Sequence, residues 1–569
     1  MKALQLLFNN FDLLLDQPDG VQQMKQTILQ WAVQGKLVRQ DPNDEPASEL
    51  LKRIALEKAE LIAQKKIKKQ KALPPITEDQ VPFEMPERWD WCRFGTLFNR
   101  FSTGPFGSML HKSDYIPNGI PVVNPANIVN GVVAPSSKMM ISQETRKRLL
   151  KYVLTSGDII IGRRGDLSKC AIIGEQEQGW LCGTGSFFIQ LSKLISKDFF
   201  VKVYISPFSQ RLLASTSIGE TMANLNQKIL NSCFFPLPPL AEQHRIVAKV
   251  EELHTLCDQL EEEQQQVQTR KQALNAASLH QLSNAEDSED FQSAWNIVSS
   301  RFEQLHDQPE SVEPLRQAIL QLAVRGKLVK QDPNDEPASE LLKRASIEKH
   351  RLYSENLIRK QPDIPEIHTE GHMPNGWACG CTAAIGVISP RYTTEDEEQV
   401  SFLPMPMIPI DFRDSVKPEM KKWGEIKKGY THLANGDVAV AKITPCFQNR
   451  KSAIMENLPS GLGAGTTELH VVTPIQGIIN AKYLLLFYKT PKFINEGIKK
   501  FTGTAGQQRV PREYFMFTPL PIPPLAEQHR IVAKTEELMA LCDQLEQQLT
   551  QSRADGQRLL QSILAEVSL

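Results

Sequence analysis

Side chains that donate hydrogen bonds gather in a few short loops of this sequence. GRRGDLSK (residues 162–169) sets cations between glycines, AKITPCFQNRK (441–451) combines cations with amides, and IGETMANLNQK (218–228) is comparable to FTGTAGQQRV (501–510). Arg, Lys, Asn and Gln are the residue types that contact phosphates and base edges. The candidate binding residues are Arg163, Arg164, Lys169, Asn224, Asn226, Lys228, Lys442, Thr444, Gln448, Asn449, Arg450, Lys451, Gln507, Gln508 and Arg509. The alternative is that these are ordinary solvated loops.

Motifs for catalysis are missing from the sequence. Adenine methylation needs an Asn/Asp-Pro-Pro-aromatic motif, and NPAN at Asn124 lacks the second proline and the aromatic residue. There is no GxxxxGK[ST] phosphate loop, and Cys379 and Cys381 have no second cysteine pair to complete a zinc site. His244 and His529 stand without a nucleophile or carboxylate, which favours docking or packing. We therefore predict no catalytic residue and no metal site, and we expect the nine cysteines to be reduced and mostly packed.

Charge is distributed unevenly along the chain. The formal net charge is only -1, but residues 86–235 carry +7 and residues 372–524 carry +4, which leaves -12 for the remainder. Two basic regions in an acidic framework are typical of a protein with two localised polyanion contacts. Chance variation in surface charge is the alternative. The lysine-rich run KKIKKQK (65–71) is a further candidate phosphate clamp, although an exposed helix end is the more common reading.

The elements that must position these loops belong to a long internal repeat. KQTILQWAVQGKLVRQDPNDEPASELLKR from Lys25 matches the segment from Arg316 at 24 of 29 positions. LAEQHRIVAKVEELHTLCDQLE from Leu240 matches the segment from Leu525 at 19 of 22 positions. The material between the two blocks diverges and differs in length by six residues. One unit has therefore been duplicated, with a nearly constant frame and a variable insert.

Each insert spans about 150 residues and is rich in short Val/Ile/Phe runs broken by Gly, Pro and Asn. This pattern predicts many short strands with a few helices. The frame is helical, because apolar residues follow alternating four-three spacing after each LAEQHR motif. The predicted seam residues are Ile246, Val250, Leu253, Cys257, Leu260, Gln264, Val267, Lys271 and Leu274, and Ile531, Thr535, Leu538, Cys542, Leu545, Leu549, Ser552, Gly556 and Leu559. We expect these seams to pack against each other or against the helices that lead into GKLV.

Several stretches resemble the specificity subunit of type I restriction-modification systems. They are PLPPLAEQHRIVAK (236–249), PIPPLAEQHRIVAK (521–534), IPVVNPANIVNGVV (120–133), GDVAVAKITPCFQNRKSAI (436–454), AVQGKL and AVRGKL. The resemblance covers nearly all of the chain. The extended N-terminal helical segment and the acidic SNAEDSED (283–290) depart from the family pattern.

The resemblance implies a non-catalytic, DNA-binding subunit. Each insert would be a target recognition domain that reads one half of a split DNA sequence, and the helices would set the distance between the halves. Two methyltransferase subunits would dock on the helices and methylate adenine, and restriction-translocase subunits would cut unmodified DNA. No cofactor is expected on this chain, since S-adenosylmethionine, ATP and Mg would belong to the partner subunits. A self-sufficient methyltransferase or nuclease, or a coiled-coil scaffold for two protein-binding domains, are the alternatives.

The expected fold class is α+β, with two α/β recognition domains separated by long antiparallel coiled-coil helices and related by a pseudo-two-fold repeat. The expected divisions are a helical region at 1–84, a recognition domain at 85–236, a central coiled coil at 237–372, a second recognition domain at 373–520 and a C-terminal coiled coil at 521–569. The apolar runs are short, and no cleavable leader precedes them, so a cytoplasmic protein without a membrane partner is expected.

Overall fold

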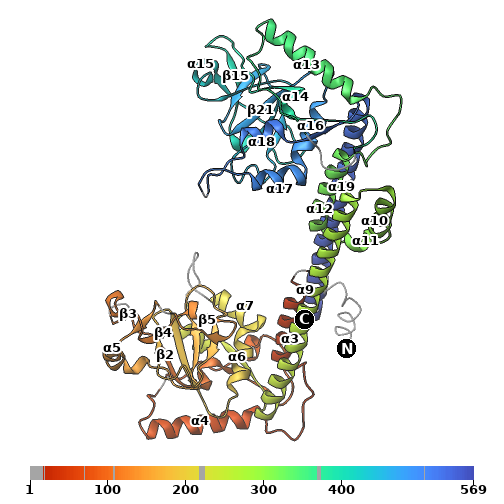
Figure 1. Cartoon of the computed structure of the whole chain (residues 1–569). Helices are drawn as coiled ribbons and strands as arrows, with labels where there is room; N and C mark the ends of the chain where they lie inside the picture. Colours follow the sequence, from red (N-terminus) through yellow and green to blue (C-terminus); the bar gives the residue numbers. More distant parts are fainter. Residues whose placement is uncertain are drawn as a thin grey trace. The chain divides into compact units, whose positions relative to one another are not determined.

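The computed structural model describes residues 17, 19–69, 71–106, 109–136, 138–216, 225–367, 373–504 and 506–568 (Figure 1). The chain forms two compact units. Unit 1 consists of residues 1–266 and 554–569, and unit 2 consists of residues 267–553. Each unit contains strands and helices, so the fold is mixed α/β, and two helices of 45 and 44 residues, α9 (Leu240–Asn284) and α19 (Leu525–Ser568), run through both.

In the described part of unit 1, α3 and α4 precede the first insert, and α9 follows it. The helices of unit 1 are α3 (Gly20–Val33), α4 (Ala47–Ala63), α5 (Gln143–Arg148), α6 (Lys197–Ile205), α7 (Pro207–Thr216) and α8 (Gln227–Ser232). Its strands are β1 (Asp90–Arg93), β2 (Phe98–Thr103), β3 (Tyr115–Ile116), β4 (Ile120–Val123), β5 (Ile128–Val129), β6 (Val132–Val133), β7 (Met140–Ile141), β8 (Ile159–Gly162), β9 (Cys170–Ile172), β10 (Leu181–Cys182), β11 (Ser186–Leu191) and β12 (Phe234–Leu237).

Unit 2 follows the same plan. Its helices are α10 (Ser288–Ser300), α11 (Phe302–Leu305), α12 (Val312–Val324), α13 (Ala338–Ser354), α14 (Thr382–Ile385), α15 (Trp423–Ile426), α16 (Ala481–Lys489), α17 (Pro491–Lys499) and α18 (Arg512–Phe517). Its strands are β13 (Ala378–Gly380), β14 (Gly386–Ile388), β15 (Gln399–Leu403), β16 (Glu419–Lys422), β17 (Thr431–Ala434), β18 (Val438–Ala441), β19 (Ser452–Ile454), β20 (Leu462–Gly465), β21 (Leu469–Pro474) and β22 (Leu520–Ile522).

Most strands of the two units correspond; the exceptions are β3, which pairs with β7, β17, which pairs with β20, and the β5–β6 pair of unit 1. The order β2-β11-β8-β9 in unit 1 matches β14-β21-β18-β19 in unit 2, and β1-β12 matches β13-β22. In the second four-stranded sheet β4 runs parallel to β10 and antiparallel to β7, as β15 does to β20 and β16. The central strands β8 (IIIG) and β18 (VAVA) are buried throughout, which explains their continuous apolar sequence. The inserts therefore share one fold although their sequences diverge.

The helices that lead into GKLV pack on the long helices, as one of the two predicted arrangements required. In unit 1 the Lys25 ammonium on α3 contacts Asp258 and Glu261 on α9 at 2.6 and 3.2 Å. In unit 2 the Arg316 guanidinium on α12 makes the matching pairs with Asp543 and Glu546 of α19 at 2.8 and 2.7 Å. The repeated contacts fix the same helix pairing in both units.

A buried glutamate joins the GKLV segment, the insert and the long helix in unit 1. The carboxylate of Glu242, in the first turn of α9, accepts hydrogen bonds from Trp89 Nε1 and Gln40 Nε2, both at 3.0 Å. Arg245, one turn later, pairs with Asp44 at 2.6 Å. The backbone at Gly35 has φ +70°, and a Cβ there would lie 2.6 Å from Pro86, so only glycine fits beside this joint.

Unit 2 repeats the joint atom for atom. Glu527 accepts from Trp377 Nε1 at 3.0 Å and from Gln331 Nε2 at 3.1 Å, and Arg530 pairs with Asp335 at 2.6 Å. The glycine that fits beside it is Gly326, with φ +68°. The repeated GKLV and LAEQHR motifs are thus explained in part by one internal joint that forms twice.

The predicted heptad seam is correct in the first half of each long helix and wrong in the last part. In α9, Val267 and Leu274 are 51% and 40% exposed, whereas Leu279 and Leu282 are 3% exposed. In α19, Ser552 is exposed and Leu559 is 50% exposed, whereas Leu560 is 1% exposed; the predicted Gly556 is buried. A straight helix has 3.6 residues per turn, so its buried face drifts by about 20° per heptad relative to a strict seven-residue repeat. The buried face has shifted by one residue after two to three heptads.

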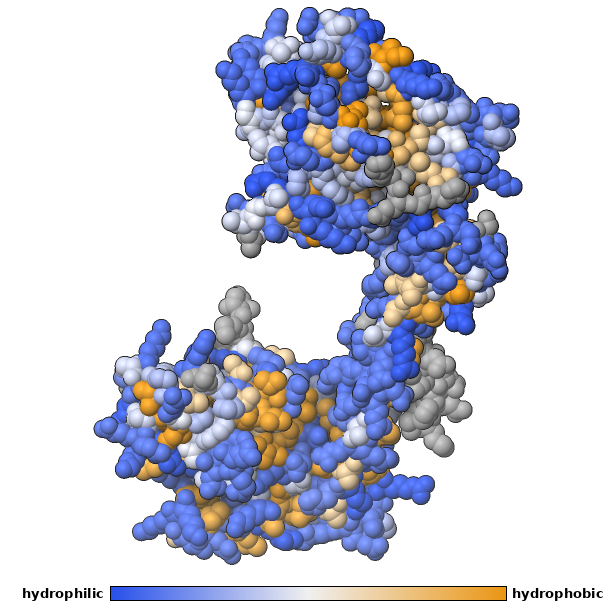
Figure 2. Space-filling view, viewed as in Figure 1, coloured by the Kyte–Doolittle hydropathy of each residue, from blue (hydrophilic) through white to orange (hydrophobic). Residues whose placement is uncertain are grey.

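The packing predicted for the cysteines is confirmed, since all nine are free and seven are buried. In the part of the chain that the structure describes, no three His, Cys, Asp or Glu side chains gather as a metal site. No helix within the described ranges is long and apolar enough to cross a membrane. Hydrophilic side chains cover most of the visible face of each unit, and apolar side chains form smaller patches (Figure 2).

Candidate nucleic-acid interface

The β8–β9 loop of unit 1 contains the predicted cluster GRRGDLSK. Arg163 follows β8 directly; its backbone N–H donates to the Gly185 carbonyl at 2.9 Å, and its own carbonyl accepts from Leu225 N–H at 3.0 Å. Arg164 is exposed at the surface of the loop. The loop is therefore fixed at its start by two neighbouring segments, while Arg164 extends into solvent.

The β18–β19 loop of unit 2 starts in the same way. Lys442 follows β18, its N–H donates to the Glu468 carbonyl at 3.0 Å, and its carbonyl accepts from Val510 N–H at 2.8 Å. Thr444 N–H donates to the Gln508 carbonyl at 2.9 Å. The two segments of insert two that the sequence marked as candidates are therefore in direct contact.

Two of the predicted contact lysines fasten loops together. Lys169, just before β9, donates from Nζ to the Ile128 carbonyl at 2.9 Å. Lys451, just before β19, donates from Nζ to the Met405 carbonyl at 3.0 Å. Both carbonyls belong to the segments that follow the equivalent strands β4 and β15: Ile128 is the first residue of β5, and Met405 opens a 3-10 turn. Equivalent lysines thus hold equivalent loops in two domains of different sequence.

Two of the predicted arginines are engaged in ion pairs. Arg509 forms a forked pair with Glu468, with Nη2 at 2.7 Å and Nε at 2.9 Å, and this pairing lowers the pKa of the Glu468 carboxyl. Arg450 has φ +59°, and its Nη2 pairs with Glu313 of α12 at 2.6 Å. These carboxylates could not be anticipated from the sequence, because neither glutamate lies near its arginine along the chain.

The amide candidates of insert two lie at or near the surface. Gln448, Asn449 and Gln507 lie on the surface, and the half-buried Gln508 lies beside them in sequence. Their amides carry donors and acceptors together, the combination that base edges require. These amides, together with Lys442, are candidates in unit 2 that the structure leaves available to a ligand.

The third predicted segment of unit 1 is only partly described, and Asn224 lies outside the described residues. Asn226 caps α8, with Oδ1 accepting from Ile229 N–H at 2.9 Å, and Lys228 is exposed on that helix. Because Leu225 and Val510 make the same backbone hydrogen bond, Asn226 corresponds to Pro511, the residue before α18. The comparable segments 218–228 and 501–510 are therefore aligned at Leu225 and Val510, and Asn226 and Lys228 lie after the loop, in the cap and first turn of α8.

A basic helix was missed at the sequence level. α5 and the turn after it (TRKRLLK) carry Lys147 and Lys151 as exposed cations, while Arg148 pairs with Asp114 at 2.8 Å. The run of four cations in seven residues was the available signal. In the other lysine-rich run, Lys65, Lys66, Lys68, Lys69 and Lys71 are all exposed after α4.

Two buried titratable groups lie on or beside the strands β18 and β21, next to the loops of unit 2. His470 donates from Nε2 to the Val510 carbonyl at 3.1 Å and stacks on Phe515, and burial lowers its pKa to about 4. Asp437 accepts from Thr473 Oγ1 at 2.6 Å and from Ala434 N–H at 2.9 Å, and burial raises its pKa to about 6. Both groups stabilise the strands from which the loops emerge.

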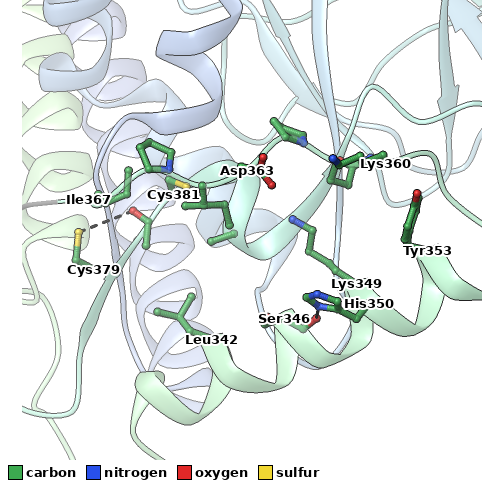
Figure 3. A pocket seen from close by; sticks show the side chains of 16 residues that line it. Leu342, Ser346, Lys349, His350, Tyr353, Lys360, Asp363, Ile367, Cys379 and Cys381 are labelled. Atoms are coloured by element: carbon green, nitrogen blue, oxygen red, sulfur yellow. Dashed lines mark hydrogen bonds between the residues drawn. The ribbon is translucent and has the colours of Figure 1, made fainter.

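A cavity of about 600 Å³ lies beside α13, and Lys349 points into it from that helix (Figure 3). In unit 1 the equivalent strand carries Arg93, whose guanidinium donates to the carbonyls of Pro74 and Ser232 at 2.7 and 2.6 Å. The matching residue of unit 2 is Cys381, which is too short to fill the same space. The two units therefore differ in side-chain volume at this position beside the cavity.

Comparison with known families accounts for the two inserts together. A model of the type I restriction modification DNA specificity domain matches residues 89–269 and 347–552, more than half of the chain. The chain belongs to this family. The two matched ranges contain both loop regions described above.

Named members of the specificity-domain family are similar to parts of the chain. The specificity subunits of the type I restriction enzymes EcoAI and EcoEI of Escherichia coli are 51% and 49% identical over 261 residues. Each alignment covers 45% of this chain and 44% of the relative, so the chain spans less than half the length of these relatives. The solved structure of the HsdS subunit from Thermoanaerobacter tengcongensis is 18% identical, with a TM-score of 0.39, over 85% of this chain and 98% of that chain.

Proposed function

We propose that this chain is the specificity subunit of a type I restriction-modification complex. Each insert domain reads one half of a bipartite duplex DNA target, and the helical frame sets the distance between the halves. The observation that carries the proposal is that the β8–β9 loop of unit 1 and the β18–β19 loop of unit 2 are held by the same backbone hydrogen bonds, while the residues within the two loops differ. A fixed frame with variable loops is suited to two different half-sequences.

The chain directs chemistry that its partners perform. The family resemblance assigns adenine methylation with S-adenosylmethionine to methyltransferase subunits, and ATP- and Mg-dependent restriction to translocase subunits. This role implies a cytoplasmic location, where the DNA is.

Identical exposed residues support two equivalent docking surfaces. The charged ridge consists of Glu45, Glu49, Lys52 and Arg53 in unit 1 and of Glu336, Glu340, Lys343 and Arg344 in unit 2. Lys52 is 70% exposed and pairs with Glu49 at 2.8 Å, and Lys343 is 69% exposed and pairs with Glu340 at 2.7 Å. Exposed pairs of this kind contribute about 1 kcal/mol or less to stability. Internal stability therefore does not explain their identity, and a partner that binds twice does.

The DNA-reading proposal is tested with the full chain in complex with its methyltransferase. Sequencing of adenine methylation in cells with and without the gene gives the bipartite site, and half-sites about one helical turn apart are expected. The purified complex should bind a duplex with that site in preference to scrambled duplexes, and salt should weaken the binding. Equal binding to both duplexes, or methylation by the purified chain alone, would overturn the proposal.

The docking proposal is tested by charge reversal in one ridge at a time. Lys52→Glu with Arg53→Glu should leave one methyltransferase per chain by mass photometry, and Lys343→Glu with Arg344→Glu should do the same. Reversal of both ridges should leave none. The control is Lys65→Glu with Lys66→Glu, an exposed pair outside the ridge, which should keep two. Unchanged stoichiometry in the ridge variants would exclude the charged ridge as the docking surface.

A further inference from the structure

Each insert domain has a cationic residue at the same position of its fold. Arg163 and Lys442 each follow the equivalent strands β8 and β18 directly. The backbone N–H of each cation donates a hydrogen bond to the residue just before the equivalent strands, Gly185 before β11 and Glu468 before β21. The backbone carbonyl of each accepts from the residue just before the helix cap, Leu225 before α8 and Val510 before α18. Because both backbone groups of the residue are hydrogen-bonded in the same way, its Cα lies at the same place relative to the strands in the two domains.

These two cations differ from Arg450 and Arg509 because neither forms an ion pair with a described residue. The Arg163 guanidinium lies over the Phe187 ring, 5.8 Å from the ring centroid, and Lys442 interacts only electrostatically with Glu468. Arg163 Nε is buried without a hydrogen-bond partner among the described residues. Burial and the neighbouring charge of Arg164 lower the pKa of the Arg163 guanidinium. Lys442 forms no ion pair within the described ranges, and the nearby Glu468 is already paired with Arg509. Both cations are thus placed to meet an anion from outside the chain.

The residues around them are not equivalent. Arg164 corresponds to Ile443, and the loop of residues 163–169 is shorter than the loop of residues 442–451. Loops that differ in length and chemistry are suited to different base sequences. A cation kept at one point in both is suited to a feature that both half-sites share, and that feature is the phosphate backbone.

We propose that Arg163 and Lys442 make equivalent, sequence-independent contacts with a DNA phosphate, one in each half-site, while the divergent loop residues discriminate bases. The proposal rests on the DNA-reading function proposed above. The exchange of Arg for Lys between the domains supports a phosphate over a base edge. A forked guanidinium and a point-charge ammonium contact base edges with different geometry, whereas a phosphate oxygen accepts from both.

The test uses the complete chain with its methyltransferase and two duplexes, one with the bipartite site and one scrambled. Arg163→Gln and Lys442→Gln should each weaken binding to both duplexes by the same factor. Each should also reduce the slope of log K against log salt concentration by about 0.9, the value for one lost phosphate contact. The matched controls exchange the two natural residues: Arg163→Lys and Lys442→Arg should keep the wild-type slope.

Two results would overturn the inference. One is a changed base preference in either half-site of a Gln variant, which would indicate base reading. The other is an unchanged salt slope in both Gln variants. If the wild-type complex itself shows no salt-sensitive preference, the DNA-reading function fails first, so the two failures are distinguishable. Circular dichroism and a normal methyltransferase stoichiometry establish that each variant is folded.

Discussion

Lys489 allows a sharp test of the packing of unit 2. Its side chain is 2% exposed, and its ammonium donates to the carbonyls of Ile410 at 2.8 Å and Arg450 at 3.0 Å. Burial lowers the pKa of this lysine to about 7, and the nearby Asp411 opposes the effect. The equivalent last residue of α6 in unit 1 is Ile205, so the fold does not require a cation here.

The sign of the pH effect follows from the two pKa values. The unfolded lysine titrates near 10.5 and the folded one near 7, so between these pH values the unfolded chain binds more protons. The free energy of unfolding therefore rises with pH across this window. At about 1.36 kcal/mol for each pH unit, the full effect is on the order of 4 to 5 kcal/mol.

Lys489→Met should leave stability at pH 7 nearly unchanged, because two effects oppose each other. The variant removes the cost of a buried charge, but it leaves two buried carbonyls without a donor, at about 1 to 3 kcal/mol each. At pH 10 the wild-type chain no longer carries the charge and keeps its donor. The wild-type chain should then be more stable than the variant by several kcal/mol.

The assay is urea unfolding of the full chain followed by tryptophan fluorescence at pH 7, 8.5 and 10. The control is Lys482→Met, which removes a partly exposed lysine that pairs with Glu536 at 2.7 Å. Other groups that titrate in this range cancel in the difference between wild type and variant. Parallel pH dependence of the wild-type chain and Lys489→Met would refute the reasoning.

Three further predictions follow from individual contacts. Leu560→Ala should cost about 2 to 5 kcal/mol of stability because Leu560 is 1% exposed, whereas Leu559→Ala, at a site 50% exposed, should stay within about 0.5 kcal/mol by urea unfolding. Trp377→Phe should lower the free energy of unfolding by at least about 1.5 kcal/mol, because the Glu527 carboxylate loses a hydrogen bond. Trp89→Phe should lower it by a similar amount, because Glu242 loses the matching hydrogen bond. A loss of stability in only one of the two variants would contradict the matched joints. His470 titrates near 4 when folded and near 6.5 when unfolded, so stability should fall by about 3 kcal/mol as pH drops through this window. His470→Phe should abolish that loss, and an identical acid profile for the variant would contradict the prediction.

The helical frame of the protein was predictable because its sequence is repeated within the chain. The duplicated GKLV and LAEQHR motifs predicted paired helical regions and two equivalent inserts, and the Val/Ile runs predicted buried strands such as β8 and β18. The seam was predictable only over its first heptads. Sequence spacing is a discrete repeat, while the buried face of a straight helix drifts continuously, so the residue at which Leu560 replaces Leu559 depends on the actual path of the helix.

The loops show where prediction from sequence ended. Composition marked Arg163, Lys169, Arg450, Lys451 and Arg509 equally, since each is a cation in a polar loop. The structure distinguishes these five cations by their partners: Arg450 and Arg509 pair with carboxylates, Lys169 and Lys451 donate to backbone carbonyls, and Arg163 forms no ion pair with a described residue.

The sequence by itself determined the duplicated helical frame, the two insert domains and the basic character of their loops, because these depend on repeats, periodicity and composition along the chain. Only the tertiary structure decided which cations remain available to a ligand. Glu313 and Glu468 neutralise two arginines, and the carbonyls of Ile128 and Met405 occupy two lysines. Each of these partners lies between about 40 and 140 residues from its cation along the chain, and folding alone brings them together.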